Sequence, residues 1–144
     1  MITVRQLLGD KHDRLWSISP DDTVFDAISM MAEHGIGALT VLDAGQLVGI
    51  VSERDYTTKV VLQDRQSRAT AVRDIMTPKV ITVTPDHTIH DCMLLMTQKR
   101  VRHLPVVEST RQVGMISIGD VLKGMLAEQE ETIHQLENYI SGNG

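Results

Sequence analysis

The stretch GIVSERD at Gly49–Asp55 recurs as GMISIGD at Gly114–Asp120. Both copies read glycine, two apolar residues, serine, two variable residues and aspartate. The apolar residues around each glycine are typical of a short buried strand. The Ser-x-x-Asp spacing that follows is that of a capping box, in which serine and a residue three positions later close the start of a helix. The stretch therefore predicts, twice in one chain, a strand that runs directly into a helix.

The repeat extends well beyond these seven residues. When the sequence is shifted by 65 positions, Ser19–Val61 aligns with Thr84–Leu126 without a gap, and 11 of the 43 pairs are identical. Average residue usage would give roughly two or three identities. A shorter repeated segment precedes each copy: VRQLL at Val4–Leu8 resembles VRDIM at Val72–Met76. The shift between these two segments is three residues longer than the shift between the main copies. The chain is therefore predicted to contain two copies of one supersecondary unit.

Each copy has the same expected order of strand, helix, strand, strand and helix. Thr23-x-x-Asp26 and Thr88-x-x-Asp91 mark the starts of the first helices, and paired strands follow as ALTVL with LVGIV and as HLPVV with VGMIS. A single copy of about 60 residues would be marginally stable alone. We therefore expect an α+β fold in which two pseudo-symmetric β-α-β-β-α repeats pack sheet against sheet, followed by a C-terminal helix.

The expected organisation is one compact two-repeat module. Residues 1–67 form the first repeat with its N-terminal lead-in, residues 68–127 the second repeat with its lead-in, and residues 128–144 a helical tail. The polar segment 62–71 is predicted to be the linker. The tail carries a sparse apolar stripe on a polar helix, which is stable only if the stripe packs on something. A partner subunit and the first repeat of the same chain are both open as its contact. The stripe consists of Leu126, Ile133, Leu136 and Ile140.

Composition excludes several classes of function. The net charge of −5 over 144 residues argues against non-specific nucleic-acid binding, and no apolar run is long enough to span a membrane. The single cysteine excludes an internal disulfide and favours a cytoplasmic setting. No Walker A, GxSxG or GxGxxG motif occurs, and no nucleophile has an identifiable base, so we expect no enzyme activity and no catalytic cofactor. His87 and His90 lack a third ligand, so no metal site is predicted.

The doubled Ser-x-x-Asp allows two interpretations. In the first, each serine and aspartate only cap a helix, because the hydroxyl accepts a backbone N–H bond and the carboxylate favours the helix dipole. In the second, the same geometry holds a ligand, with the carboxylate on vicinal ribose hydroxyls and the serine on a phosphate. The spacing alone favours the cap.

Several motifs together resemble a tandem pair of CBS domains, the family named for cystathionine β-synthase. They are the IMTP segment, the helix start PDDTVFDA, the strand HLPVV and the two GhhSxxD stretches, in which h is aliphatic or methionine. The resemblance covers about Val4 to Leu126. SERDY, RVRHLPV and SIGD are most similar to small stand-alone bacterial pairs. The resemblance implies an adenosyl ligand, namely AMP, ADP, ATP, NAD or S-adenosylmethionine, in clefts between the repeats, and it implies a homodimer.

The family's ligand contacts map onto matching positions of this sequence. The serine and aspartate of each GhhSxxD stretch would contact ribose or phosphate, and the residue after each glycine would line the adenine slot. The lead-in of the second repeat would supply a threonine beside the first aspartate, whereas residues 11–17 contain no matching MTP. Residues that lead into the second strand of each repeat would also face the ligand. The complete expected set is Ile36, Gly37, Ala38, Ile50, Ser52, Arg54, Asp55, Thr77, Lys79, Val80, Val101, Arg102, His103, Met115, Ser117 and Asp120.

The two expected sites differ in charge. Arg102 and His103 are basic, whereas the matching residues Gly37 and Ala38 are not. An arginine fork suits phosphate oxygens, so we expect the Asp55 site to prefer phosphorylated ligands. Alternatively, Arg102, His103 and Arg54 are solvated surface residues. The resulting functional hypothesis is a regulatory adenosyl-ligand sensor in signal transduction. The alternatives are a protein–protein interaction or dimerisation module without ligand, and an S-adenosylmethionine-binding module.

Overall fold

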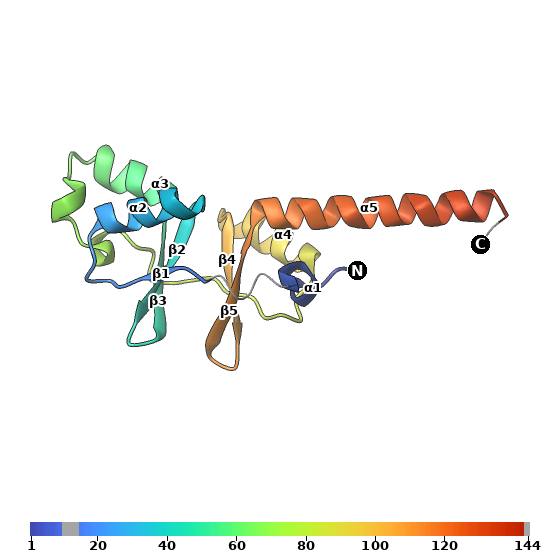
Figure 1. Cartoon of the computed structure of the whole chain (residues 1–144), viewed down its shortest axis with the longest axis horizontal. Helices are drawn as coiled ribbons and strands as arrows, with labels where there is room; N and C mark the ends of the chain where they lie inside the picture. Colours follow the sequence, from blue (N-terminus) through green and yellow to red (C-terminus); the bar gives the residue numbers. More distant parts are fainter. Residues whose placement is uncertain (10–14, 143–144) are drawn as a thin grey trace. The chain divides into compact units, whose positions relative to one another are not determined.

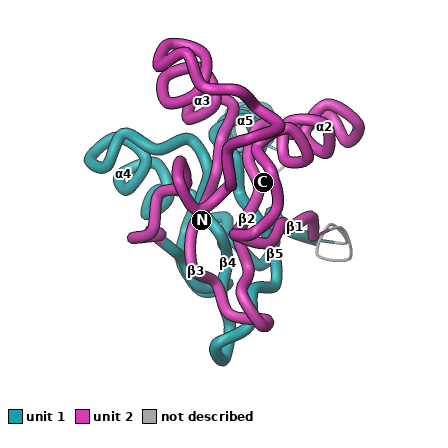
Figure 2. The backbone as a smooth tube through the Cα atoms, turned by 90° about the vertical axis from the view of Figure 1, so that its left-hand side faces the viewer, with its two compact units in different colours: residues 1–14, 82–144 teal, residues 15–81 magenta. Residues whose placement is uncertain are grey.

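The computed structural model describes residues 1–9 and 15–142. The chain divides into two compact units (Figure 2): residues 1–14 with 82–144 form unit 1, and residues 15–81 form unit 2. The units therefore do not coincide with the sequence copies at 1–67 and 68–127. Each unit combines the body of one copy with the lead-in segment that precedes the other copy in the sequence.

Unit 2 contains the expected order of strand, helix, strand, strand and helix (Figure 1). Its sheet has the order β1–β2–β3, with β1 parallel and β3 antiparallel to β2. The core of unit 2 lies between one face of the sheet and α2, where Ile18, Leu39 and Val51 are buried with Ala27 and Met31. Its elements are β1 (Ser17–Ile18), α2 (Val24–His34), β2 (Ala38–Asp43), β3 (Gln46–Ser52), α3 (Glu53–Tyr56), a π-helical turn η2 (Thr57–Val61) and the 3₁₀ turns η3 (Ser67–Ala69) and η4 (Val72–Asp74).

Unit 1 repeats this plan with two differences. Its first strand is reduced to a single parallel bridge between Val83 and Val106, and its last helix is a regular helix of 23 residues. Both hairpins have an irregularity at the same place, between Val41 and Leu42 and between Val106 and Val107. The elements of unit 1 are α1 (Val4–Leu8), α4 (Ile89–Lys99), β4 (His103–Glu108), β5 (Arg111–Ser117) and α5 (Ile118–Ile140).

The lead-in segments attach by the same three backbone hydrogen bonds in each unit. In unit 1, the backbone N–H of Ile89 donates to the carbonyl oxygen of Ile2 at 3.0 Å. The backbone N–H groups of Val4 and Arg5 donate to the carbonyl oxygens of His87 and Pro85, respectively.

The corresponding bonds of unit 2 run from Val24 to Thr70, from Val72 to Asp22 and from Arg73 to Pro20. The repeated VRQLL and VRDIM segments are therefore packing elements. Their sequence shift differs from that of the main copies because the connection between lead-in and copy differs in length.

The expected linker belongs to unit 2, where side-chain hydrogen bonds hold it. Thr70 is buried, and its hydroxyl donates to the carbonyl oxygen of Gln66 at 2.8 Å. Tyr56 and Ser67 are joined through their hydroxyls at 3.2 Å. The polar composition of 62–71 thus reflects short turns with local side-chain bonds.

The helix starts agree with the sequence pattern. Capping boxes form at Thr23 with Asp26, Thr88 with Asp91, Ser52 with Asp55 and Ser117 with Asp120. Helix α2 ends at Gly35 in a left-handed conformation, which glycine adopts without steric cost. Within the described residues, no helix is long and apolar enough to cross a membrane.

Candidate functional site

The candidate site in unit 2, here called the Asp55 site, is built where β3 meets α3. It comprises Ile50, Ser52, Asp55, Thr77 and Gly37, all of which unit 2 contributes. Thr77 pairs with Ile50 through two backbone hydrogen bonds, 2.8 Å from Thr77 N to Ile50 O and 3.0 Å in the reverse direction. Glu53 N–H donates to Gly37 O at 3.0 Å. The lead-in and the start of β2 are thereby fixed beside the Ser52 cap.

The Asp55 carboxylate is held by three groups. Its Oδ2 accepts bonds from Ser52 N at 2.9 Å and from Ser52 Oγ at 3.1 Å. Its Oδ1 lies 3.0 Å from Lys59 Nζ, one helical turn later. Lys59 Nζ also donates to the carbonyl oxygen of Ile75 at 2.9 Å, which connects the carboxylate to the lead-in segment. The sequence reasoning missed Lys59, although its i,i+4 spacing from Asp55 was a usable signal.

A row of small polar side chains crosses the sheet of unit 2 next to Ile50. Ser17 is paired with Thr40, Thr40 with Ile50, and Ile50 with Thr77. Directly paired residues point to the same face of a sheet, and neighbours along a strand point to the other face. The row therefore lies on the face opposite the core residues Leu39 and Val51.

Thr40 is the unexpected member of this row. It is fully buried, and its hydroxyl has no hydrogen-bond partner among the described residues. A buried hydroxyl without a partner is unfavourable, so a water or ligand atom that reached Thr40 Oγ1 would be stabilised there. The corresponding position of unit 1 is Pro105, paired with Met115, and offers no hydroxyl. The alternation of side chains along β2 could have indicated that Thr40 faces away from the core. It could not have indicated that the Thr40 hydroxyl lacks a hydrogen-bond partner.

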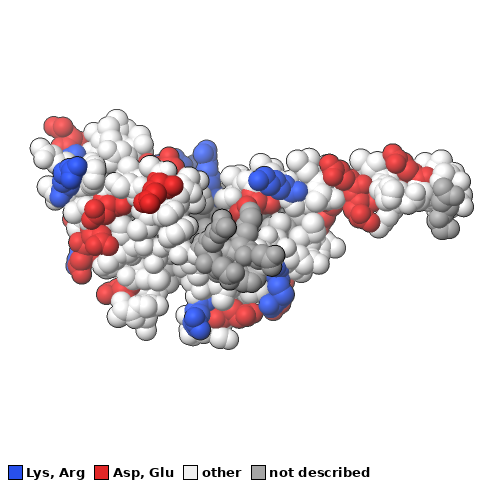
Figure 3. Space-filling model, viewed as in Figure 1, with Lys and Arg blue, Asp and Glu red and all other residues white. Residues whose placement is uncertain are grey.

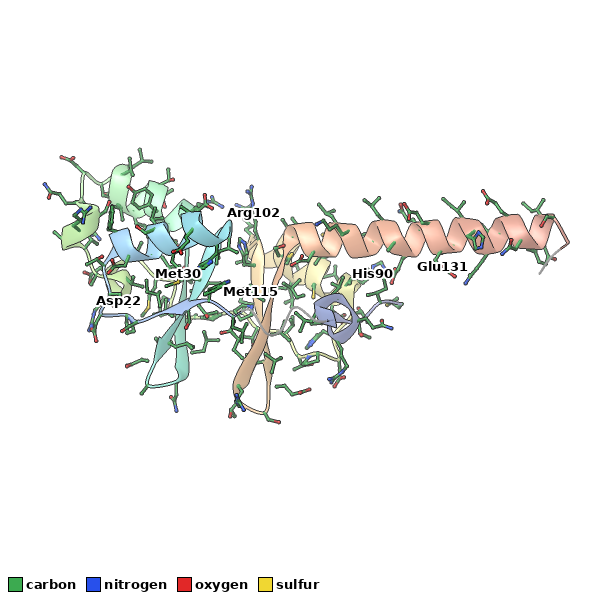
Figure 4. All side chains as sticks on the ribbon, in the orientation of Figure 1. Asp22, Met30, His90, Arg102, Met115 and Glu131 are labelled. Carbon is green, nitrogen blue, oxygen red and sulfur yellow. The ribbon has the colours of Figure 1, made fainter. Side chains whose placement is uncertain are left out.

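The candidate site in unit 1, the Asp120 site, has the same frame. Asp120 Oδ2 accepts from Ser117 N at 2.9 Å, and Asp120 N donates to Ser117 Oγ at 3.2 Å. Ile118 N–H donates to Arg102 O at 2.9 Å, which repeats the Glu53–Gly37 bond. Figure 4 labels Arg102 before β4 and Met115 on β5. The capping boxes that the Ser-x-x-Asp spacing predicts are therefore present in both units.

The remaining expected residues differ in exposure. Within unit 2, Arg54, Thr77 and Lys79 are exposed, Ile36 and Val80 are partly buried, and Ala38 is buried. Within unit 1, Arg102 is exposed, whereas Val101 and His103 are partly buried. The basic pair Arg102 and His103 belongs to unit 1 with Asp120, and Lys79 and Arg54 belong to unit 2 with Asp55. Residues 11–17, which would match the MTP position in the other repeat, lie largely outside the described residues.

The two histidines with metal-like spacing have structural partners. His87 Nδ1 accepts the backbone N–H of Thr84 at 2.9 Å, and His90 Nε2 lies 3.8 Å from Glu128 Oε2. In the part of the chain that the structure describes, no group of three or more His, Cys, Asp or Glu residues could hold a metal ion. Cys92 is buried in the core of unit 1.

Comparisons with known proteins agree with the fold. The family model of the CBS domain matches residues 4–61 and 72–127. A putative signal-transduction protein with CBS domains from Burkholderia ambifaria is 49% identical, with a TM-score of 0.85 over 88% of this chain and 96% of that one. The mitochondrial CBS domain-containing protein CBSX3 from Arabidopsis thaliana is 45% identical over 89% of this chain, which spans 64% of that relative's length.

A more distant structure has the same fold. The CBS domain pair of protein MJ0100, solved with 5′-methylthioadenosine and S-adenosyl-L-methionine, gives a TM-score of 0.78 at 23% identity, over 89% of this chain and 98% of that one. The repeated strand-to-helix frame, the two family matches and the stand-alone relatives lead to one conclusion. The chain belongs to the CBS domain family and is a tandem CBS pair of mixed α and β structure with a C-terminal helix.

Proposed function

We propose that this chain is a non-catalytic regulatory sensor that binds an adenosyl ligand, with AMP, ADP, ATP or NAD as the preferred class. The observation that supports it most directly is the row beside Ile50, where Thr40 has a buried hydroxyl without a partner among the described residues. The Asp55 carboxylate lies at the end of the same strand pair. Carboxylate and hydroxyl groups around an aliphatic side chain suit a ribose joined to a flat base.

The Asp55 site and the Asp120 site would differ in selectivity. The Asp55 site has the hydroxyls of Thr40 and Thr77, whereas the Asp120 site has Pro105 at the position of Thr40. Arg102 leads into β4, and its guanidinium would suit phosphate oxygens. The sensing step would be a shift between two states of the protein for which the ligand has different affinities.

The first experiment is mass spectrometry of small molecules released when the purified protein is denatured. Thermal unfolding with AMP, ADP, ATP, NAD and S-adenosylmethionine then ranks the ligands, because saturation at 100 times the dissociation constant stabilises by about 2.7 kcal/mol. An interaction module without a ligand would release nothing and would be stabilised by none of these compounds. Chromatography after hours with ATP or NAD detects turnover, which would contradict the non-catalytic assignment.

The ribose role is separated from the capping role by Asp55→Ala and Asp120→Ala. Loss of a cap alone should lower stability by about 0.5–2 kcal/mol and leave ligand affinity unchanged. Loss of charge-assisted bonds to ribose should weaken binding by about 1.5–3 kcal/mol, which is one to two decades in Kd. A 2′,3′-dideoxy ligand is the control, because it should lose little further affinity in the variant. If neither variant changes affinity for any adenosyl ligand, the aspartates only cap helices.

The phosphate role of Arg102 has its own test. Calorimetry on Arg102→Ala should show a lower affinity for AMP and a nearly unchanged affinity for adenosine. Equal losses for both ligands would assign Arg102 to packing or to the base. The cytoplasmic setting expected from the single cysteine is part of the proposal, and fractionation of cells that express the protein tests it.

A further inference from the structure

The last helix of unit 1 leaves an apolar face without a partner in the described chain. Near its start, α5 is anchored, because Val121 and Gly124 are buried and Gly124 lies against Leu7 and Ile89 of the same unit. Farther along, Ile133 is 55% exposed and Ile140 is 83% exposed. In Figure 1, the second half of α5 stands out from the rest of unit 1. Most helical stability in proteins comes from packing of an apolar face, so this half of α5 would gain stability if its stripe were covered.

The exposed face has the spacing of a coiled-coil seam, which is a different stripe from the one that anchors the helix. Its positions alternate in steps of four and three residues, which is the a/d pattern of two paired helices. From first to last they span 19 residues, or about 28 Å of helix. The apolar members are exposed by 49% to 83%. The seam consists of Leu122, Leu126, Gln129, Ile133, Leu136 and Ile140.

The charges beside the seam distinguish the two orientations of a helix pair. Lys123, Glu130 and Glu137 follow the d positions on one flank, and Met125, Thr132 and Tyr139 precede the a positions on the other. Figure 3 shows a basic side chain over the first half of α5 and acidic side chains over its second half. In a parallel pair, the Lys123–Glu130–Glu137 flank of one helix would face the Met125–Thr132–Tyr139 flank of the other. That arrangement brings no opposite charges together.

We propose that α5 pairs in antiparallel orientation with α5 of a second copy of this chain. Antiparallel pairing brings like flanks together, so Lys123 of each copy meets Glu137 of the other. The same register gives the core layers Leu122 with Ile140, Leu126 with Leu136, and Gln129 with Ile133, each occurring twice. Leu122 and Leu126, which would receive the end of the other helix, are exposed.

The register also contains one unfavourable contact. At its centre, Glu130 meets Glu130 of the second copy, opposed by the two Lys123–Glu137 pairs. Glu130→Gln is therefore expected to tighten the dimer severalfold, and the gain should shrink as salt rises. A variant that left association unchanged at low salt would contradict the register.

The first test is sedimentation equilibrium of the full chain and its variants. Ile133→Asp should raise the dimer Kd at least 100-fold, because it places a charge in the seam. His134→Asp is the matched control, since its position lies outside the seam and should change Kd less than twofold. Both sites are exposed, so circular dichroism should show both variants folded. A monomeric wild type at tens of micromolar, or equal association of both variants, overturns the proposal.

A charge exchange tests the orientation. Lys123→Glu and Glu137→Lys should each weaken association about three- to tenfold, and the double variant should return within twofold of wild type. No recovery in the double variant would exclude the antiparallel register.

Cysteine cross-linking gives an independent answer on orientation. Thr132→Cys meets its own copy only in the antiparallel pair, whereas Ile140→Cys does so only in a parallel pair. The native Cys92 will not compete, because it is buried and burial raises its pKa to about 11. Disulfide formation by Thr132→Cys and not by Ile140→Cys supports the proposal, and the reverse result overturns it.

Discussion

Lys59 Nζ lies 3.0 Å from Asp55 Oδ1, and this pair joins the capping carboxylate to the lead-in through the carbonyl oxygen of Ile75. The lysine side chain is 42% exposed and the aspartate side chain 15%, so the ion pair is partly screened by solvent. Unit 1 has Gly124 at the position of Lys59, so this connection distinguishes the two units.

Lys59→Met should lower the free energy of unfolding by about 0.5–1.5 kcal/mol, because it removes a partly exposed ion pair and a bond to a backbone carbonyl. Its coupling energy with Asp55→Ala should be about 0.2–1 kcal/mol and should fall with added salt. Urea unfolding of the four proteins in the cycle measures both quantities. Lys79→Met, at an exposed lysine of the same unit, should change stability by less than about 0.5 kcal/mol. Equal effects of both lysine variants would show that the Asp55 pair contributes nothing.

The glycines of the two repeated stretches are required by the lead-in segments that pack on them. A Cβ at Gly114 would approach Leu8 Cδ2 to 2.6 Å, and a Cβ at Gly49 would approach Met76 Sδ to 2.6 Å and Thr77 O to 3.2 Å. Gly114→Ala should therefore destabilise by about 1–3 kcal/mol. In combination with Leu8→Ala, the cost should be smaller than the sum of the single costs.

Gly119→Ala provides the matched control in the same unit. A Cβ at Gly119 meets only Ser117 Oγ at 3.6 Å, and the residue lies within α5. The change should therefore stabilise the protein by up to about 1 kcal/mol. Thermal unfolding ranks the variants, and a stability of Gly114→Ala equal to wild type would refute the close approach of Leu8.

The local parts of the fold were predictable because they depend on neighbours in the sequence. Ser52 and Asp55 are three residues apart, so their spacing alone indicated the cap that the structure contains. The packing of Leu8 on Gly114 was not predictable from the residues, because the two are distant in sequence and nothing in VRQLL indicates the copy on which it packs. Only the family resemblance placed the lead-in of the second repeat, with Thr77, beside Asp55. The lack of a partner for the Thr40 hydroxyl was also not predictable, because it depends on residues that are distant in sequence.

The hairpin of unit 1 carries backbone strain at its turn. Ser109 and Thr110 have φ values of 51° and 66°, a left-handed conformation that is unfavourable for a β-branched residue. Thr110→Gly should raise the free energy of unfolding by about 0.5–1 kcal/mol, because relief of strain exceeds the added entropy of the unfolded chain. The equivalent turn of unit 2 has Gly45 at φ 82°, so Gly45→Thr should have the opposite sign. Chemical denaturation of both variants measures the two changes in the free energy of unfolding. Changes of the same sign would contradict strain at the turn as their cause.

The buried thiol of Cys92 predicts a pH dependence. Burial raises its pKa from the ordinary value of about 9 to about 11 in the folded protein. The folded state therefore holds the proton more tightly than the unfolded state, so this group's contribution to stability is complete below about pH 9 and falls as pH rises towards 11. The thiol should not react with a disulfide reagent at pH 8 until the protein unfolds. Cys92→Ser should remove this part of the alkaline slope, and an unchanged slope would assign it to other groups.

Thr40→Val examines the buried hydroxyl at the candidate site. Because Thr40 Oγ1 has no partner among the described residues, its replacement by a methyl group should leave stability unchanged or raise it by up to about 1 kcal/mol. Thr70→Val is the matched control, since the Thr70 hydroxyl donates to Gln66 O at 2.8 Å, and its loss should cost about 1 kcal/mol. With a saturating adenosyl ligand, a hydroxyl that meets the ligand would reverse the sign for Thr40→Val. Thermal unfolding with and without AMP and NAD separates these outcomes. If Thr40→Val is destabilised as much as Thr70→Val without ligand, the hydroxyl already has a partner and is no marker of the site.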